Sequence, residues 1–472
     1  MPSPDYPSEI ENVKGKNLLP DVIDKTTQTK NGITLTFLDN NQINLKGTST
    51  ATTAIDLLLK ESTKITKDIY VHLRNNGTGS ASIALLNSSK QFGWCSFGET
   101  NKISKLNGVS SESSEINKIR FFINAGQTID ITFQPSLEYT SDITRYVPYG
   151  NIQIVETGKN LFNDNFNDYT KPADYRICPI NLEQGQTYTL RALLKGTKVT
   201  GYVVAIVPYG SKYMDFSSRL FNAIDRYGDV TGARTITIDE TWTSPKLVIY
   251  ANDKATFESL FKNYEIQLEK GSIATDYEPY KEEVVNIDLK GNELCSLPNG
   301  TKDELIVKDG RAKIVKRIGK VVLNGSDDES WTKRNDGDGR TTISFNYNIN
   351  NIGAINQMNN RFQKSTSSTD GIEGLAIPSQ LIQIYIQIKR NRLSTLDVTG
   401  FKAWLQANPV VLQYELETPE EIDLGEVSTL TTYEGTSNIT NSEDAEMSIE
   451  YKGNKDLEFY IKSGNHFLKW LR

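Results

Sequence analysis

A short motif recurs along this chain and divides the sequence into similar units. Gly-Lys-Asn-Leu occupies residues 15–18 and returns at residues 158–161, and a related Gly-Asn-Glu-Leu follows at residues 291–294. A proline and a tyrosine precede the three copies, as Pro4-Asp5-Tyr6, Pro148-Tyr149 and Pro279-Tyr280. Because self-similarity of this kind marks a repeated structural unit, the chain is predicted to contain three units, each entered through a Pro/Tyr joint.

The ends of the first two units repeat as well. Phe133–Glu138 leads to Tyr146–Tyr149, and Ile266–Gly271 leads to Tyr277–Tyr280. Each of these endings predicts a final strand, which is followed by a loop across the edge of the domain and then by the joint. The predicted organisation is an extended N-terminal arm at 1–14, β-sandwich modules at 15–150 and 151–285, a β-rich domain at 286–452 and a docking tail at 453–472.

Apolar and polar residues alternate with a period of two through the first two units, which is the pattern of half-buried strands. The alternating segments are residues 32–37, 67–73, 118–123, 128–133, 186–191, 201–207, 234–238 and 246–250. The chain also holds 22 tyrosines and 17 phenylalanines against 4 methionines, and aromatic residues favour pleated, half-buried surfaces. The predicted fold is mainly β: tandem antiparallel β-sandwich, jelly-roll-like modules plus a C-terminal β-rich domain with one short helix.

The third unit is less regular but carries clear local signals. Lys308-Asp309-Gly310 separates two apolar runs and predicts a hairpin. The helix is predicted after Asp397 or Thr399 as the cap, with Phe401, Trp404 and Leu405 on one inward face. Pro409 should end this helix before the next strand.

Composition argues against several classes of protein. The chain has 472 residues and a net charge of −7, without a long basic block, so binding to nucleic acid through phosphates is not expected. No apolar run approaches the ~18 residues of a membrane helix, so membrane insertion is not expected. Cys95, Cys178 and Cys295 are far apart, and the two histidines are His72 and His466, so neither a zinc site nor a disulfide framework is predicted.

Catalytic and metal-binding patterns are weak. Asp239 and Glu240 are neighbours in a predicted strand and would point to opposite faces, and the pair Asp276 and Glu278 lies in a joint. His72 alternates with apolar residues, which predicts a solvent-facing side chain. The acidic stretches Asp327–Glu329 and Asn335–Gly339 are interpreted as solvated hairpin tips rather than calcium loops, and the run from Glu417 to Asp423 as a solvated face. We therefore predict no enzyme activity, no cofactor and no metal.

Several strings in the chain resemble the minor structural proteins of tail tips and baseplates, including tail-fibre-like proteins, in tailed phages of Gram-positive bacteria. The resemblance rests on residues 1–10, 158–162, 266–281, 294–304 and 396–415, and these strings touch all three predicted units. It implies that the first two units are similar to carbohydrate-binding β-sandwich modules and that the protein belongs to the virion tail, after synthesis in the host cytoplasm. The resemblance carries over no catalytic motif.

Carbohydrate-binding modules need flat aromatic faces for sugar rings and nearby polar groups for hydroxyls. The three candidates are Trp94, Trp242 and Trp331. Trp94 lies between Gly93 and Gly98 and either packs in a core or loop or contacts a glycan. Trp242 follows a turn and is interpreted mainly as core, whereas Trp331 lies in a polar stretch and is expected to be the most exposed.

The sequence therefore predicts a non-enzymatic component of a phage tail tip, baseplate or tail fibre. Its partners would be other tail proteins and host cell-wall polysaccharide, and its tandem modules would help the virion attach to the host surface. The alternative is a purely architectural hub or spacer that binds only other tail proteins; a cell-wall hydrolase is a third, weaker hypothesis. Apolar residues between Leu457 and Leu471 also predict a homo-oligomer, a trimer or higher.

Overall fold

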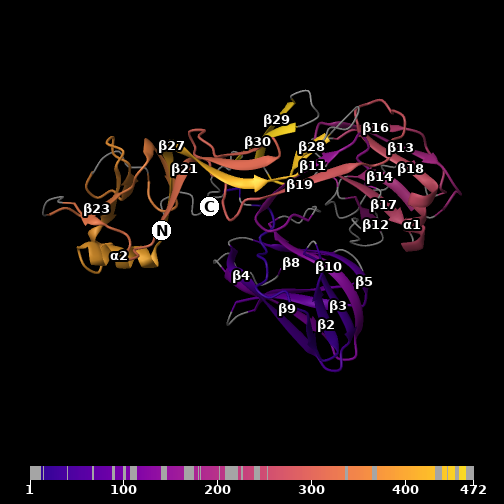
Figure 1. Ribbon diagram of the computed structural model, residues 1–472, viewed down its shortest axis with the longest axis horizontal. Helices are drawn as coiled ribbons and strands as arrows, with labels where there is room; N and C mark the ends of the chain where they lie inside the picture. Colours follow the sequence, from indigo (N-terminus) through magenta and orange to yellow (C-terminus); the bar gives the residue numbers. More distant parts are fainter. Residues whose placement is uncertain are drawn as a thin grey trace. The chain divides into compact units, whose positions relative to one another are not determined.

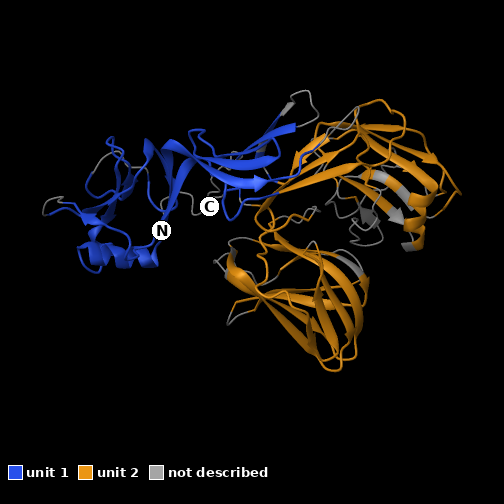
Figure 2. Ribbon diagram, viewed as in Figure 1, with its two compact units in different colours: residues 1–14, 287–431, 443–472 blue, residues 15–286, 432–442 orange. Residues whose placement is uncertain are grey.

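A computed structural model shows a chain built mainly from antiparallel strands (Figure 1). It describes residues 12–463 except for 14, 40, 66–67, 88–90, 99–101, 107–113, 140–145, 164–174, 179, 181, 201, 208–221, 225–226, 239–244, 252–253, 335–338, 364–368, 431–437, 444 and 452–456. The chain forms two compact units: unit 1 contains residues 1–14, 287–431 and 443–472, and unit 2 contains residues 15–286 and 432–442 (Figure 2).

The first module of unit 2 consists of two antiparallel sheets around one core. One sheet has the order β1 (Gln28–Lys30), β2 (Ile33–Phe37), β3 (Ile43–Thr48), β10 (Thr128–Glu138), β5 (Tyr70–Thr78), β8 (Lys102–Lys105). The other has the order β4 (Thr53–Ile65), β9 (Ser114–Ile123), β6 (Ala81–Leu86), β7 (Gln91–Phe97). Phe133 of β10 meets Phe97 and Phe121 of the opposite sheet, with ring centroids 5.0 and 5.2 Å apart. The predicted sandwich is confirmed.

The second module repeats this two-sheet plan with fewer strands and its own core. One sheet has the order β12 (Tyr175–Ile177), β17 (Lys246–Ala251), β14 (Tyr202–Val207), β15 (Asn222–Ile224), and the other β16 (Arg234–Thr237), β13 (Thr187–Leu194), β18 (Tyr264–Lys270). Helix α1 (Lys254–Asn263) was not predicted. Its Phe257, Leu260 and Phe261 have the i, i+3, i+4 spacing of a helix that packs one face on the core.

The segments that follow the Pro148-Tyr149 and Pro279-Tyr280 joints form strands that pair with each other. β11 (Asn151–Thr157) lies between β19 (Glu282–Asp288) and β28 (Asn438–Asn441) in a three-stranded sheet. Gln153 of β11 donates a side-chain hydrogen bond of 3.0 Å to Asn286 of β19. These segments are therefore ladder strands rather than free linkers.

The first copy of the repeated motif closes the first module through the buried side chain of Asn17. Its Oδ1 accepts hydrogen bonds from the backbone N–H groups of Leu19 (3.0 Å) and Leu137 (3.1 Å), and its Nδ2 donates to the carbonyl of Val147 (3.1 Å). Next to it, the N–H of Leu18 donates to the carbonyl of Leu137 at 2.8 Å. One amide thus holds the start of the module against its last strand and the following joint.

The second copy makes the same clasp in the second module. Oδ1 of the buried Asn160 accepts from the N–H groups of Phe162 (3.0 Å) and Leu268 (3.1 Å). Its Nδ2 donates to the carbonyls of Ile266 (3.0 Å) and Glu278 (2.9 Å). The sequence repeat is therefore a repeat of one hydrogen-bonding device, which we call the asparagine clasp.

The third copy has a different local structure. The side-chain amide of Asn292 donates to the carbonyl of Leu289 in a turn, at 2.8 Å. Leu294 forms an isolated antiparallel bridge with Val13, so the end of the predicted N-terminal arm pairs inside unit 1. The motif resemblance at 291–294 does not extend to the clasp.

Unit 1 is built on a six-stranded antiparallel sheet and a four-stranded one. The six-stranded sheet has the order β24 (Ile352–Asn359), β27 (Val410–Glu426), β21 (Arg311–Leu323), β20 (Glu304–Lys308), β30 (Leu457–Ser463), β29 (Ala445–Tyr451). The four-stranded sheet has the order β22 (Thr332–Lys333), β23 (Thr342–Asn348), β26 (Gln383–Lys389), β25 (Gly374–Ala376). The predicted hairpin joins β20 to β21, with Asp309 and Gly310 at φ 50° and 69°, as a tight two-residue turn requires.

The predicted helix is α2 (Val398–Ala407), and Asp397 is its cap. The carboxylate of Asp397 accepts from the N–H of Gly400 at 2.9 Å. Phe401 is fully buried and stacks on Phe345 with ring centroids 4.2 Å apart, while Trp404 is half-buried against the same core. A short 3₁₀ turn, η3 (Arg390–Arg392), precedes the helix.

The described part of the predicted docking tail is a strand of unit 1. β30 lies between β20 and β29, and its Phe459 and Ile461 are buried. Residues 464–472, where the tail prediction continues, lie outside the described residues.

The clasp predicts a large loss of stability on removal of one amide. Asn17→Ala leaves two backbone N–H groups and one carbonyl without their buried partner, so the free energy of unfolding of the first module should fall by about 3 kcal/mol. The control is Asn292→Ala, the asparagine of the third copy, where Glu293 aligns with Asn17; it should cost less than about 1 kcal/mol, because Asn292 donates only to a carbonyl in its own turn. Chemical denaturation of the two full-length variants measures the difference; equal losses would contradict the structural role of the clasp.

Candidate functional site

Trp94 lies in the middle of strand β7 and points away from the core. Its neighbours Phe92, Cys95 and Phe97 are buried, whereas the Trp94 side chain is 58% exposed. The interpretation of Trp94 as a core or loop-packing residue is therefore wrong. Tryptophan side chains are mostly buried in folded proteins. The outer face of the sheet around Trp94 is therefore a candidate binding surface.

A single cross-strand row runs from Trp94 across all four strands of this sheet. Trp94 of β7 is opposite Ala84 of β6, Ala84 is opposite Arg120 of β9, and Arg120 is opposite Asp56 of β4. Residues opposite each other in paired strands share a face. The indole and the two charged groups therefore lie on the same outer face, with only an alanine between them.

Arg120 and Asp56 hold each other in a fixed geometry. Nε and one terminal nitrogen of Arg120 donate to the two carboxylate oxygens of Asp56, at 2.5 and 2.7 Å. Lys118 Nζ lies 3.4 Å from the same carboxylate. The hydrogen bond from Arg120 is the main reason that the pKa of Asp56 lies below its ordinary value, so the carboxylate is ionised at neutral pH.

The rows on either side complete the surface. Phe122 lies two residues beyond Arg120 on the same face, and its ring centroid is 5.8 Å from the guanidinium carbon. In the same row as Phe122, the hydroxyls of Ser82 and Ser96 are 2.9 Å apart. We call the surface of Trp94, Arg120, Asp56, Lys118, Phe122, Ser82 and Ser96 the Trp94 face.

The Trp94 face combines the two elements that sugar recognition needs. The exposed indole offers a flat apolar face to the C–H side of a pyranose ring. Arg120 has five N–H donors, of which the pair with Asp56 uses two, and the carboxylate keeps acceptor capacity. Because these groups are oriented by each other, a hydroxyl-bearing ligand would meet donors and acceptors that are already in place.

Trp331 occupies a different environment from the predicted one. It is only 5% exposed, and its ring contacts Phe401 and Tyr347 with centroids 4.9 and 5.1 Å away. Its Nε1 donates to the carboxylate of Glu329 at 2.6 Å. The prediction of an exposed Trp331 is wrong, because Glu329 supplies the buried acceptor that lets the indole enter the core of unit 1.

Glu329 also corrects the interpretation of residues 327–329 as a solvated tip. Asp327 and Asp328 are exposed, but Glu329 is buried and accepts from the backbone N–H groups of Asn324 (2.6 Å) and Gly325 (3.0 Å). Its carboxylate thus closes the turn and positions Trp331. Trp242, and residues 335–338 of the second acidic stretch, lie outside the described residues.

The acidic run in β27 faces its partner strand. Glu421 pairs with Lys313 and Asp423 with Arg311, each at 2.7 Å, and all four side chains are exposed. These are cross-strand ion pairs on a solvated face, in keeping with the sequence prediction. Exposed pairs of this kind contribute little to stability.

His72 is buried, in contrast to the predicted solvent-facing position. It is 2% exposed, and its Nδ1 lies 3.9 Å from the carboxylate of the buried Glu138. Lys16 Nζ lies 3.8 Å from the same carboxylate, and Arg74 extends over the ring of Tyr146. Alternation of apolar and polar residues predicted an exposed His72. The prediction failed because the start of the first module, at Lys16, and the segment before its joint, at Tyr146, cover this end of the sheet's outer face.

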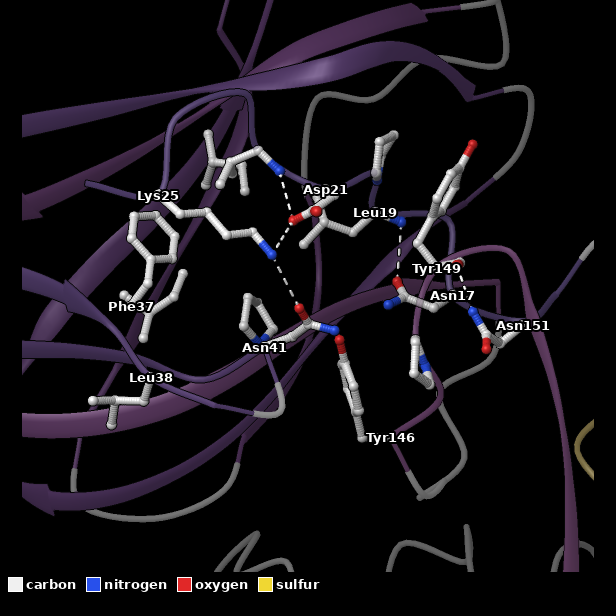
Figure 3. Close-up of a pocket in the computed structure, with 16 residues that line it drawn as sticks. Asn17, Leu19, Asp21, Lys25, Phe37, Leu38, Asn41, Tyr146, Tyr149 and Asn151 are labelled. Atoms are coloured by element: carbon white, nitrogen blue, oxygen red, sulfur yellow. Dashed lines mark hydrogen bonds and ion pairs between the residues drawn. The ribbon is translucent and has the colours of Figure 1, made fainter. Parts of the chain in front are cut away.

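A second candidate site, which is concave, lies in the first module between the joint and the loop after β2. We call it the joint pocket; Figure 3 shows Lys25 between Asp21 and Asn41, with Tyr146 next to Asn41 and Tyr149 on the joint. Lys25 Nζ is 2.8 Å from the Asp21 carboxylate and donates to Asn41 Oδ1 at 3.3 Å. None of these residues was predicted as a site, because they come from segments that only the fold brings together.

The two tyrosines of the joint pocket keep their protons at neutral pH. Burial raises the pKa of Tyr146 above its ordinary value, against the lowering effect of a hydrogen bond with Asn41. Burial and the nearby carboxylate of Glu61 raise the pKa of Tyr149 to about 12. Both hydroxyls can therefore donate hydrogen bonds.

No protein-family model and no curated protein matches the chain. In the described part of the chain, none of the helices has the length and apolar character needed to cross a membrane.

The buried role of Glu329 can be tested by substitution. Glu329→Ala removes the acceptor of two backbone N–H groups and of the Trp331 indole, so the free energy of unfolding of unit 1 should fall by about 3 kcal/mol. Asp328→Ala, one residue earlier and exposed, should stay within about 0.5 kcal/mol of the wild type. Chemical denaturation followed by tryptophan fluorescence measures both, and a small effect of Glu329→Ala would restore the interpretation as a solvated tip.

Proposed function

We propose that this chain is a non-catalytic component of a phage tail tip, baseplate or tail fibre, which helps the virion attach to host cell-surface polysaccharide. The observation that carries the proposal is the Trp94 face, where an exposed indole shares one strand row with a mutually oriented arginine and carboxylate. The resemblance of the sequence to tail-tip and baseplate proteins supports the location in the virion tail.

The expected mode of attachment is many weak contacts rather than one strong site. A single exposed tryptophan with a few hydrogen-bonding groups holds a sugar weakly, since binding also costs translational freedom and side-chain ordering. Repeated copies raise the effective concentration and turn weak sites into firm attachment. The proposal therefore includes a homo-oligomer, a trimer or higher, bound to other tail proteins.

Removal of the indole should weaken polysaccharide binding without harming the fold. Trp94→Thr keeps a residue suited to a strand and should lower the affinity for purified Gram-positive cell-wall polysaccharide at least about tenfold, because buried aromatic anchors dominate binding energy. The control is Tyr227→Thr, an aromatic residue of the second module that is 55% exposed and should leave the affinity unchanged. Equilibrium binding of the full-length proteins, with their thermal midpoints, gives both readouts.

The outcomes separate the alternatives. Absence of polysaccharide binding by the oligomeric wild type would refute attachment to glycan and favour the architectural hub. Equal losses in the Trp94 and Tyr227 variants would mean non-specific adhesion. Release of reducing sugar from cell walls would contradict the non-catalytic part of the proposal.

The pH dependence of binding should follow Asp56. Because Arg120 holds the pKa of Asp56 below its ordinary value of 3.8, the contribution of the pair is present above that value and is lost as the pH falls through the lowered pKa. Affinity for the polysaccharide should therefore be constant between about pH 5 and 8 and fall only at more acidic pH. A loss of affinity centred near pH 6 would point instead to a histidine.

A further inference from the structure

We propose that the joint pocket binds a single uncharged sugar residue, such as the end or a side branch of a polysaccharide chain. This inference rests on the proposed attachment to glycan and adds a second site of different character. The Trp94 face is an open surface that suits the flat side of a ring within a chain. The joint pocket is concave and suits one ring that enters it.

The size of the pocket sets the first limit. Its volume is about 240 Å³, below the ~300–1,000 Å³ typical of sites for larger ligands. A single pyranose ring fits a space of this size, whereas a longer oligosaccharide does not. The ligand would therefore enter as a terminal unit or as a branch.

The walls of the pocket are aromatic and proline-rich. Tyr149 and Pro148 come from the joint, Tyr146 lies just before them, and Phe37 and Leu38 come from the end of β2 and the residue after it. Tyr149 is 37% exposed and thus offers part of its ring to a ligand. Sugar rings pack their C–H faces against such surfaces.

The polar side of the pocket is a chain of hydrogen bonds that ends in a donor. Asp21 pairs with Lys25, and Lys25 donates to Asn41 (Figure 3). Asn41 is in turn hydrogen-bonded to the Tyr146 hydroxyl. The two bonds of Lys25 use two of its three protons. Because the chain fixes these side chains before binding, a sugar hydroxyl would not have to order them.

The charges around the pocket cancel, which defines the ligand as uncharged. Asp21 is matched by both Lys25 and Lys60, with Nζ to carboxylate distances of 2.8 and 3.0 Å, and Glu61 adds a second carboxylate beside Tyr149. Of the residues that line the pocket, the charged ones are Asp21 and Lys25, and because they pair with each other they leave no excess charge to attract an anion. A neutral polyol keeps all of these pairs intact.

The test is a titration of the full-length protein with methyl glycosides of glucose, galactose and N-acetylglucosamine, followed by ligand-observed NMR and calorimetry. At least one of the three should bind, with a dissociation constant in the millimolar range that a ligand of this size reaches. Glycerol 1-phosphate is the charged probe and should not bind more tightly. Tighter binding of the phosphate would overturn the assignment of an uncharged ligand.

Two substitutions address the pocket itself. Tyr149→Ala removes the exposed wall and should weaken binding of the glycoside about tenfold. Asn41→Gly removes the amide from the hydrogen-bonded chain and should weaken it severalfold; glycine is the replacement because Asn41 has φ 57°, which other side chains rarely adopt. Tyr227→Ala is the control and should change nothing. Thermal midpoints show whether each variant is folded.

The possible results distinguish a sugar-binding pocket from an inert one. Failure of all three glycosides to bind the wild type, or equal binding by wild type, Tyr149→Ala and Asn41→Gly, would refute the pocket as a sugar site. The same protein samples are assayed for polysaccharide binding, so the two proposals fail separately. Retained polysaccharide binding with an inert pocket removes only this inference, whereas glycoside binding without polysaccharide binding removes only the attachment function.

Discussion

The asparagine clasp is the interaction on which the architecture of unit 2 depends. In each module the oxygen of one buried side-chain amide, Asn17 or Asn160, accepts hydrogen bonds from two backbone N–H groups. The nitrogen of the same amide donates to a backbone carbonyl just before the next joint, that of Val147 or Glu278. A buried polar group without partners is costly, so the chain is committed to this arrangement once the core forms. The clasp also places the joint against the module, and the joint residues Tyr146 and Tyr149 thereby become walls of a pocket.

Sequence periodicity was sufficient for most of the β architecture, because strands, hairpins and helix α2 leave local signals. The Asp309-Gly310 turn and the cap of α2 depend on neighbouring residues alone; the turn was predicted, and Asp397 was one of the two predicted caps. Failures arose where distant segments decide burial. His72 is covered by the start and joint of its module, and Trp331 is buried because the Glu329 carboxylate turns inward. The residues next to His72 and Trp331 in the sequence do not indicate these distant or inward-turned contacts.

The same limit applies to the candidate sites. Trp94 was a candidate from the sequence, but Arg120 and Asp56 join it only through the register of four strands. The alternation in residues 118–123 places Arg120 on an outer face, yet it does not give the strand order that sets it beside an indole. The joint pocket is harder still to predict from the sequence. Its residues Asp21, Asn41 and Tyr149 come from a loop, a turn and a joint, which only the fold brings together. The candidate sites of this chain therefore depend on topology more than on motifs.

The position of β30 has a consequence for the order of events during synthesis. This strand, residues 457–463, lies inside the six-stranded sheet between β20 and β29, although β20 precedes it by some 150 positions along the chain. Until β30 has been synthesised, β20 keeps one edge unpaired, while both modules of unit 2 already have their core residues. A prematurely ended chain would display an open sheet edge, which is a target for proteases and aggregation. A chain that has β30 thus differs from one that lacks it by the closure of this sheet edge.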